Sequence, residues 1–269
     1  MFPLRVILPL LVASIALVDG IRAACRRRIH DAVASTIVPS STHHLASPKL
    51  QDTLAIIATE VVTGTVGLLL TLALIPPFFR YLSNPALGAL DFSWHGEVLL
   101  LVATAVVMGG YCWSLLHVHR LPFAIKFHHL VTLVFCFFKF YVGATAEISF
   151  VLGVCGLFMS QPPFVADLLL RCKTKWCYAA FRFAVGYNIV VKSSAIATVL
   201  YIMCCQSLTT FEWAWQGSLV VALAVLQCMI TLRLIDRMKM ALDVSQGDTA
   251  IADSVVAKLI SPLVSPKSC

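Results

Sequence analysis

The sequence predicts an all-α protein, a multi-pass bundle of about seven membrane-spanning helices, or six if the first segment does not span. Hydrophobic residues make up 59% of the 269 residues and charged residues only 12%, about half the charged share of an ordinary soluble domain. Several apolar runs are long enough to cross a bilayer as helices. The basic residues lie in short clusters between those runs, where they fix the orientation of a membrane protein.

Seven apolar segments follow one another along the chain. Most contain the roughly 20 apolar residues that a helix needs to cross the hydrocarbon core, and few runs alternate as the strands of a membrane barrel do. Pro162 and Pro163 predict the one strong helix break inside a span. The segments are predicted over residues 4–18, 54–79, 96–118, 127–143, 145–170, 178–205 and 214–236.

The first segment, residues 4–18, is short, so a span, an interfacial helix and a cleaved signal peptide all stay open. Small residues follow it, as they do before a signal cleavage site. Its flanking charges favour a span, because only Arg5 precedes it whereas four arginines follow within residues 22–28. A signal peptide normally shows the opposite bias.

Basic residues predict the orientation of the bundle. Connections rich in Lys and Arg alternate with connections that hold none or only Arg80. Under the positive-inside rule the rich connections are cytosolic, and the C-terminal tail lies on the same side. The basic residues of the rich connections are Arg22, Arg26, Arg27, Arg28, Lys49, Arg120, Lys126, Arg171, Lys173, Lys175, Arg233, Arg237 and Lys239.

The chain divides into three regions on this basis. Residues 1–53 form a hydrophobic anchor followed by a polar cytosolic linker over about 29–53, residues 54–236 form the helix bundle, and residues 237–269 form a cytosolic tail. The net charge of +7 reflects the membrane flanks, so no nucleic-acid partner is expected. Cys25, Cys172 and Cys177 lie beside predicted membrane ends and basic residues, a setting that suggests palmitoylation as a hypothesis.

Ionisable groups inside a span are costly, so they mark functional sites by default. Segment 127–143 opens with His128 and His129, and Thr132 shares their helix face. Lys139 returns to the same stripe three turns later, so the stripe should face the bundle interior. A structural role at the headgroup level stays open for the histidines. No metal or other cofactor is expected, because the chain has too few histidines for the histidine boxes of membrane hydroxylases.

Segment 178–205 carries a second group of polar residues. Lys192 falls near its middle, Asn188 lies one turn earlier, and Arg182 lies near its cytosolic end. Together they predict a surface that binds lipid headgroups or pairs with carboxylates. With the carboxylates predicted inside other spans, Lys192 also supports a transporter or channel as an alternative function. The carboxylates of those spans are Glu60, Glu97, Glu147 and Asp167.

Two stretches resemble a known family. One begins at Gly110-Tyr111 and ends with His128-His129 and Thr132, and the other is residues 165–173 around Asp167. This combination resembles the TLC family, which includes ceramide synthases, translocon-associated membrane proteins and lipid-homeostasis proteins. The resemblance covers at most residues 54–236, and its specific part is about 110–175.

The resemblance implies a catalytic set of His128, His129 and Asp167. In ceramide synthases a histidine pair and two aspartates are needed to transfer an acyl group from acyl-CoA to a sphingoid amine. The first aspartate and the histidine before it fall on Phe164 and Pro163, so this set is incomplete. An aspartate that other members carry after Gly-Tyr falls near Ser114 or Leu115.

The expected function is therefore to act on or sense lipids in a membrane, with sphingolipid N-acyl transfer as the specific version. In that version His128 or His129 would act as a general base and Asp167 would fix its tautomer. Membrane lipids are the expected partners, with acyl-CoA, a sphingoid base and a second copy of the chain as further ones. The endoplasmic reticulum is the location that the resemblance implies. A purely structural or assembly role stays open as well.

Overall fold

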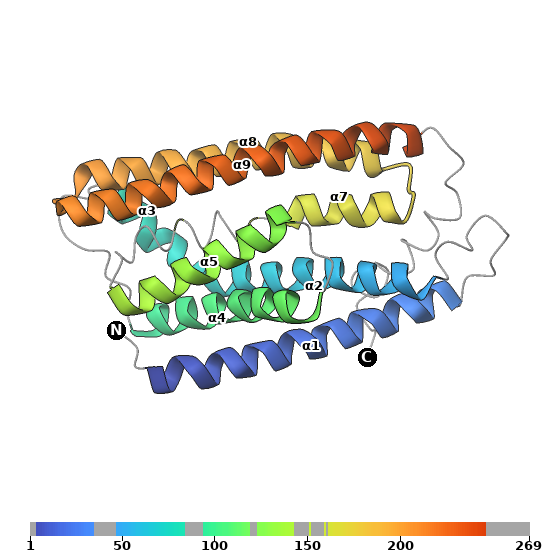
Figure 1. Cartoon of the computed structure of the whole chain (residues 1–269), viewed down its shortest axis with the longest axis horizontal. Coiled ribbons are helices and arrows are strands. Elements are labelled where there is room, and N and C mark those ends of the chain that lie inside the picture. Colours follow the sequence, from blue (N-terminus) through green and yellow to red (C-terminus); the bar gives the residue numbers. More distant parts are fainter. Residues whose placement is uncertain are drawn as a thin grey trace. The chain divides into compact units, whose positions relative to one another are not determined.

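The computed structural model describes residues 4–34, 47–83, 94–118, 123–142, 151, 159 and 161–245. Over these ranges the chain is helical and contains no strand, so the predicted all-α class is confirmed (Figure 1). The helices are α1 (Leu4–Ala34), α2 (Pro48–Thr71), the 3-10 turn η2 (Leu72–Leu74), α3 (Ile75–Ser83), α4 (Trp94–His117), α5 (Phe123–Val142), α7 (Gln161–Arg171), α8 (Cys177–Cys205) and α9 (Thr210–Ser245).

Five stretches of helix within the described residues are long and apolar enough to cross a membrane. They correspond to the predicted segments 4–18, 54–79, 96–118, 178–205 and 214–236. Large apolar side chains such as Leu69, Phe183 and Val190 lie exposed on them, as lipid-facing positions require. The molecule is an integral membrane bundle of helices. The predicted segment 145–170 lies largely outside the described residues, so the count of seven spans stays a prediction.

The first helix is longer than the sequence predicted. α1 continues past residue 18 to Ala34, through the arginine cluster, because Ala and Arg are strong helix formers and no proline interrupts them there. α2 begins at Pro48, where a proline costs no hydrogen bond. The polar linker predicted over residues 29–53 is therefore helical at both ends, which corrects that prediction. Residues 35–46 lie outside the described part of the chain.

Prolines shape two other helix ends. Pro76 and Pro77 lie in the first turn of α3, directly after η2 tightens the end of α2. Pro162 and Pro163 likewise lie in the first turn of α7. A first turn has no intrahelical acceptor for its N–H groups, so proline is tolerated there. The break predicted at Pro162-Pro163 is thus the beginning of a helix.

The last helix begins with a capping box. Thr209 Oγ1 accepts the backbone N–H of Glu212 at 3.3 Å, and Glu212 Oε2 accepts the backbone N–H of Thr209 at 2.8 Å. These reciprocal bonds satisfy two of the backbone donors that a helix N-terminus leaves unpaired. They explain why α9 begins at Thr210, before the apolar run that predicted a start at residue 214.

The chain forms two compact units. The first contains the described parts of Met1–Val18, Thr63–Ser160 and Ile189–Thr231. Its core joins α1, α3, α4, α5, α8 and α9 through buried apolar side chains. Among these residues are Leu11, Phe78, Met108, Leu133, Val199, Ile202, Met203 and Val220.

A close helix contact in the first unit depends on a glycine. A Cβ placed on Gly109 of α4 would lie 2.8 Å from the carbonyl carbon of Ser14 in α1. Real Cβ atoms essentially never approach backbone that closely, so α1 and α4 pack through this position. Gly110 has open space around its own Cβ position. Close packing of the two helices therefore depends on Gly109 rather than on Gly110.

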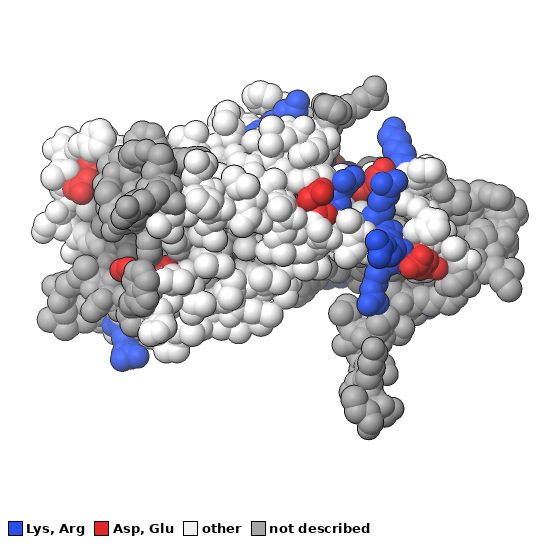
Figure 2. Space-filling model, turned by 90° about the horizontal axis from the view of Figure 1, so that it is seen from below, with Lys and Arg blue, Asp and Glu red and all other residues white. Residues whose placement is uncertain are grey.

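The second unit contains the described parts of Asp19–Val62, Gln161–Asn188 and Leu232–Cys269. Ile29 and Val33 of α1 pack with Leu54 and Ala55 of α2 and with Cys172. Asp52 of α2 lies 3.6 Å from Nη2 of Arg22 and 3.1 Å from Nε of Arg26, one turn apart on α1. Figure 2 shows Lys and Arg side chains gathered in a band with acidic side chains among them.

The thiols at the α7–α8 connection are buried in this unit. Cys177 donates its S–H to the carbonyl oxygen of Ala241 in α9 at 3.3 Å, and both residues are fully buried. Cys172 is 1% exposed, and this burial raises the pKa of its thiol to about 12. Neither cysteine is accessible to an acyl donor, so the idea of palmitoylation at Cys172 and Cys177 is wrong for the folded protein.

Candidate functional site

A polar cluster lies between α4 and α5 in the first unit. Tyr111 and Ser114 of α4 meet His128 and His129 of α5. Tyr111 and Ser114 are three residues apart and so share one face of α4. Tyr111, Ser114 and His129 are all buried. We call these four residues the α4–α5 polar cluster.

The hydrogen bonds of Ser114 determine the tautomer of His129. Ser114 Oγ lies 3.0 Å from the carbonyl oxygen of Tyr111 and 2.7 Å from Nδ1 of His129. A carbonyl oxygen only accepts, so the single hydroxyl proton of Ser114 goes to Tyr111. His129 must then donate its Nδ1–H to Ser114 Oγ. In the neutral imidazole this leaves Nε2 of His129 with a lone pair, the form that accepts a proton.

His128 has one bonded and one unbonded nitrogen. Its Nε2 lies 3.3 Å from the hydroxyl oxygen of Tyr111. Its Nδ1 is buried without a hydrogen-bond partner among the described residues. Buried polar atoms of native proteins nearly always have a partner, so an unsatisfied nitrogen here suits a ligand atom.

Aromatic contacts hold the two imidazole rings in place. The ring of Tyr111 stacks on His129 with centroids 4.2 Å apart and planes inclined by 16°. It meets His128 edge to face, with centroids 5.5 Å apart. Both histidines therefore pack on one tyrosine ring, which restricts their rotation. His117 forms a separate stack on Trp113 and bonds the carbonyl oxygen of that residue at 3.0 Å.

Two more predicted site residues belong to the same unit. Thr132 is buried on α5, one turn after the histidines. Lys192 of α8 is half-buried and lies close enough to His128 for an electrostatic interaction between them. The side chain of Lys139 lies outside the described part of α5, and Glu147 lies outside the described residues. The structure thus brings Lys192 close to His128, a proximity that the sequence did not predict.

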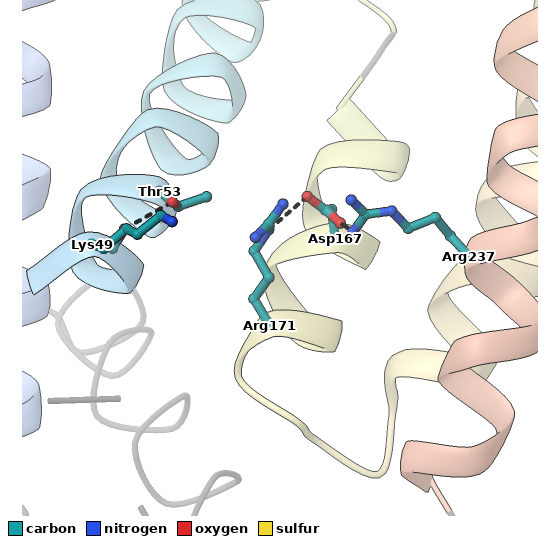
Figure 3. Close-up of polar contacts among 5 residues, drawn as sticks. All are labelled: Lys49, Thr53, Asp167, Arg171 and Arg237. Atoms are coloured by element: carbon teal, nitrogen blue, oxygen red, sulfur yellow. Dashed lines mark hydrogen bonds and ion pairs between the residues drawn. The ribbon is translucent and has the colours of Figure 1, made fainter. Parts of the chain in front are cut away.

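Asp167 lies in the second unit, on α7. Its Oδ2 lies 3.0 Å from Nε of Arg171, and its Oδ1 contacts Nη1 of Arg237 in α9 (Figure 3). Both carboxylate oxygens are therefore engaged by guanidinium groups. The partner that orients His129 is the hydroxyl of Ser114, in the role that the sequence hypothesis gave to Asp167. A catalytic role for Asp167 itself stays a prediction.

The remaining predicted residues lie on α8 within the second unit. Arg182 is exposed, as expected for a residue that contacts headgroups. Asn188 is buried, at 4% exposure, one turn before Lys192. Their lipid-binding roles stay predictions. Over the residues that the structure describes, no group of three or more His, Cys, Asp or Glu side chains could hold a metal ion.

Tyr111 and Ser114 are the site residues that sequence reasoning did not single out. Both lie in an apolar helix, where a tyrosine and a serine are unremarkable in themselves. Two sequence features could have pointed to them. They are three residues apart and so share a helix face, and a short connection joins their helix to the one that carries the histidines.

Comparison with known proteins adds no relative. No family model, no curated protein and no solved structure matches the chain. The interpretation of the site therefore rests on its geometry. In that geometry a tyrosine and a serine of one helix bond two histidines of the next, inside an integral membrane bundle.

Proposed function

We propose that this protein is a divergent TLC-domain protein that binds a membrane lipid at the α4–α5 polar cluster and acts on its polar group. The observation that carries the proposal is the bond between Ser114 and His129, which orients a buried imidazole with Nε2 free to accept a proton. Nδ1 of His128, which has no hydrogen-bond partner among the described residues, offers a second position for a polar atom of the ligand. A lipid amine or hydroxyl supplies such an atom.

The reaction that this arrangement supports best is N-acyl transfer from acyl-CoA to a sphingoid base. The amine nitrogen attacks the thioester carbonyl carbon, so a C–N bond forms and the C–S bond breaks. Nε2 of His129 takes the proton that the nitrogen loses, and the departing thiolate of CoA then receives it. Ser114 holds His129 in the tautomer that this step needs. The Tyr111 ring restricts both imidazoles to one geometry.

Charge placement supports a cytosolic orientation for the second unit. The end of α1, the α7–α8 connection and the end of α9 all bring Lys or Arg into this unit. Under the positive-inside rule this charge favours a cytosolic C-terminal tail. We propose the endoplasmic reticulum as its location, as in proteins of the TLC family, with membrane lipids as partners. We also propose that the protein forms a homodimer.

The decisive experiment measures acyl transfer in membranes that lack their own ceramide synthases. The full chain is expressed there and supplied with a sphingoid base and labelled acyl-CoA. Labelled ceramide is expected from the parent and from His117→Ala, and its yield should fall about 10²-fold or more in His129→Ala. His117 is the matched control, because it is a histidine of α4 that lies in a separate stack. If the folded parent protein yields no labelled ceramide, the proposal of acyl transfer is wrong.

Transport is the second candidate function, and the proximity of Lys192 to His128 favours it. Two ionisable groups that share a site inside a bundle are suited to relay protons. In proteoliposomes, proton flux that depends on both residues would support transport. If the proton flux is unchanged in Lys192→Gln, transport is excluded as the function of this site, and lipid binding is tested next.

A further inference from the structure

A second group of charged side chains belongs to the second unit. Asp167 and Arg171 are one turn apart on α7, and Arg237 reaches them from α9 (Figure 3). One carboxylate thus receives two guanidinium groups from two helices. Its oxygens are divided between them, Oδ2 to Arg171 and Oδ1 to Arg237.

A third arginine joins this group. Arg233 lies one turn before Arg237 on α9, on the same face of that helix. It interacts electrostatically with Arg237, Arg171 and Asp167. Two of those three interactions are repulsive, and the single carboxylate offsets only part of the repulsion. The group as a whole therefore carries a surplus of positive charge.

Solvent reaches this surplus charge. The side chains of Arg171, Arg237 and Asp167 are 30%, 23% and 21% exposed. They are thus partly buried, where charge interactions are less screened than on an open surface, yet an anion has access. Arginine presents planar, paired N–H donors that match phosphate oxygens, and several arginines around one point are typical of phosphate recognition.

We infer that Arg171, Arg233 and Arg237 form a binding site for a phosphate group, with Asp167 occupying part of it when no ligand is bound. The ligand is either the phosphate of a lipid headgroup or that of a water-soluble phosphate compound. The site is distinct from the α4–α5 polar cluster and does not depend on the acyl-transfer proposal. Nearby Lys239 is not part of it, because it is 73% exposed and paired with Asp236 at 3.4 Å.

The test uses the purified full chain with inorganic phosphate in detergent, and with lipid nanodiscs of phosphatidylcholine with or without phosphatidic acid. Thermal unfolding and direct binding are measured for the parent and for single variants. Arg237→Gln and Arg233→Gln should weaken phosphate binding about tenfold, since each removes a charge-assisted contact. Lys239→Gln removes the same charge from the same helix and should leave the affinity within about twofold, because an exposed pair contributes little.

Asp167→Asn should change phosphate affinity in the opposite direction to the arginine variants. Removal of the competing carboxylate should tighten phosphate binding several-fold, and added phosphate should restore thermal stability that the variant loses. If an arginine variant fails to fold, Arg237→Lys keeps the charge without the paired donors and should bind at an intermediate level.

The two arms identify the source of the phosphate. Binding of inorganic phosphate in detergent indicates a soluble ligand, whereas stabilisation only by phosphatidic acid indicates a lipid headgroup. Absence of both effects would overturn the site. So would a loss in Lys239→Gln as large as that in Arg237→Gln, or weaker binding in Asp167→Asn.

Discussion

Ser114 and His129 form the shortest side-chain contact of the α4–α5 polar cluster, with Oγ and Nδ1 2.7 Å apart. The two residues come from neighbouring helices, and both are buried, at 2% and 6% exposure. Since the Ser114 hydroxyl also bonds the carbonyl oxygen of Tyr111, it receives rather than donates at the histidine. A neutral alcohol thus performs the orienting task that carboxylates perform in many histidine-dependent sites.

Loss of the Ser114 hydroxyl should therefore affect both stability and chemistry. Ser114→Ala leaves the buried Nδ1–H of His129 without an acceptor, which costs about 1–3 kcal/mol. It also frees the imidazole to change tautomer, so acyl transfer should fall about 10- to 100-fold. Thermal unfolding in detergent and the ceramide assay check the two effects. Ser83→Ala is the control, because its exposed hydroxyl bonds the carbonyl oxygen of Phe79 in the same helix, and the substitution should change neither stability nor acyl transfer.

Gly109 and Gly110 should respond differently to the same substitution. In Gly109→Ala the new Cβ meets the backbone of Ser14 at 2.8 Å, so α1 and α4 must separate at a cost of about 1–3 kcal/mol. In Gly110→Ala the new Cβ meets nothing within 4 Å, and the better helix former should stabilise by up to about 1 kcal/mol. Melting temperatures of both variants, compared with that of the parent, test this difference. Equal effects would contradict the close contact between the two helices.

Lys173 ends α7 in an unfavourable backbone conformation. Its φ is 55°, and its N–H and that of Thr174 bond the carbonyl oxygens of Leu170 and Leu169 at 2.9 and 3.1 Å. This is a Schellman motif, in which glycine is the favoured residue. Lys173→Gly should therefore stabilise the protein by about 1 kcal/mol. Lys173→Ala removes the same side chain without relieving the strain and should not stabilise. A stabilising Ala variant would assign the effect to charge.

Cys172 should resist alkylation until the pH is high. Its pKa of about 12, raised by burial from 9.0, leaves almost no thiolate at neutral pH in the folded protein. Labelling by iodoacetamide, followed by mass spectrometry, should be slow at pH 8 and accelerate toward pH 12. The same cysteine labelled after unfolding in dodecyl sulfate is the control. Fast labelling of the folded protein at pH 8 would show that the thiol is exposed.

The same shift has a consequence for stability. A folded pKa above the unfolded value means that the neutral thiol stabilises the fold fully below pH 9, and that this contribution is lost as pH rises toward 12. Cys172→Ser removes the titration at that position. The alkaline decline in melting temperature should therefore be smaller in this variant than in the parent.

Helix positions were predicted well where a long apolar run decides them. The run predicted over 178–205 is α8, Cys177–Cys205, because polar residues stand close to both ends of the apolar run. Residues 18–34 were not recognised as a continuation of α1, because apolar content gives no signal in a polar helix. There the helix is held by Ile29 and Val33 packing on α2 and by the ion pairs of Asp52.

The candidate site shows the same division. His128 and His129 were identified because ionisable residues inside a span stand out by their cost. Tyr111 and Ser114 carry no such signal, and only the packing of α4 on α5 shows that they bond the histidines. Asp167 was grouped with the histidines by the resemblance to the TLC family. A resemblance in sequence does not specify a bonding partner, and the carboxylate of Asp167 is bonded to Arg171 and Arg237.

The order of amino acids alone predicts an all-α integral membrane protein. It also shows that His128 and His129 belong to an apolar segment and which connections carry basic charge. Those properties follow from composition and from the order of residues along one segment. A spanning helix needs a long apolar run, and basic residues beside that run set its orientation, so both are visible locally. The contacts between helices come from the tertiary packing. Ser114 bonds His129, Gly109 packs against Ser14, and Arg237 pairs with Asp167. These partners come from different helices, and contacts between helices depend on rotation and register, which no local pattern specifies.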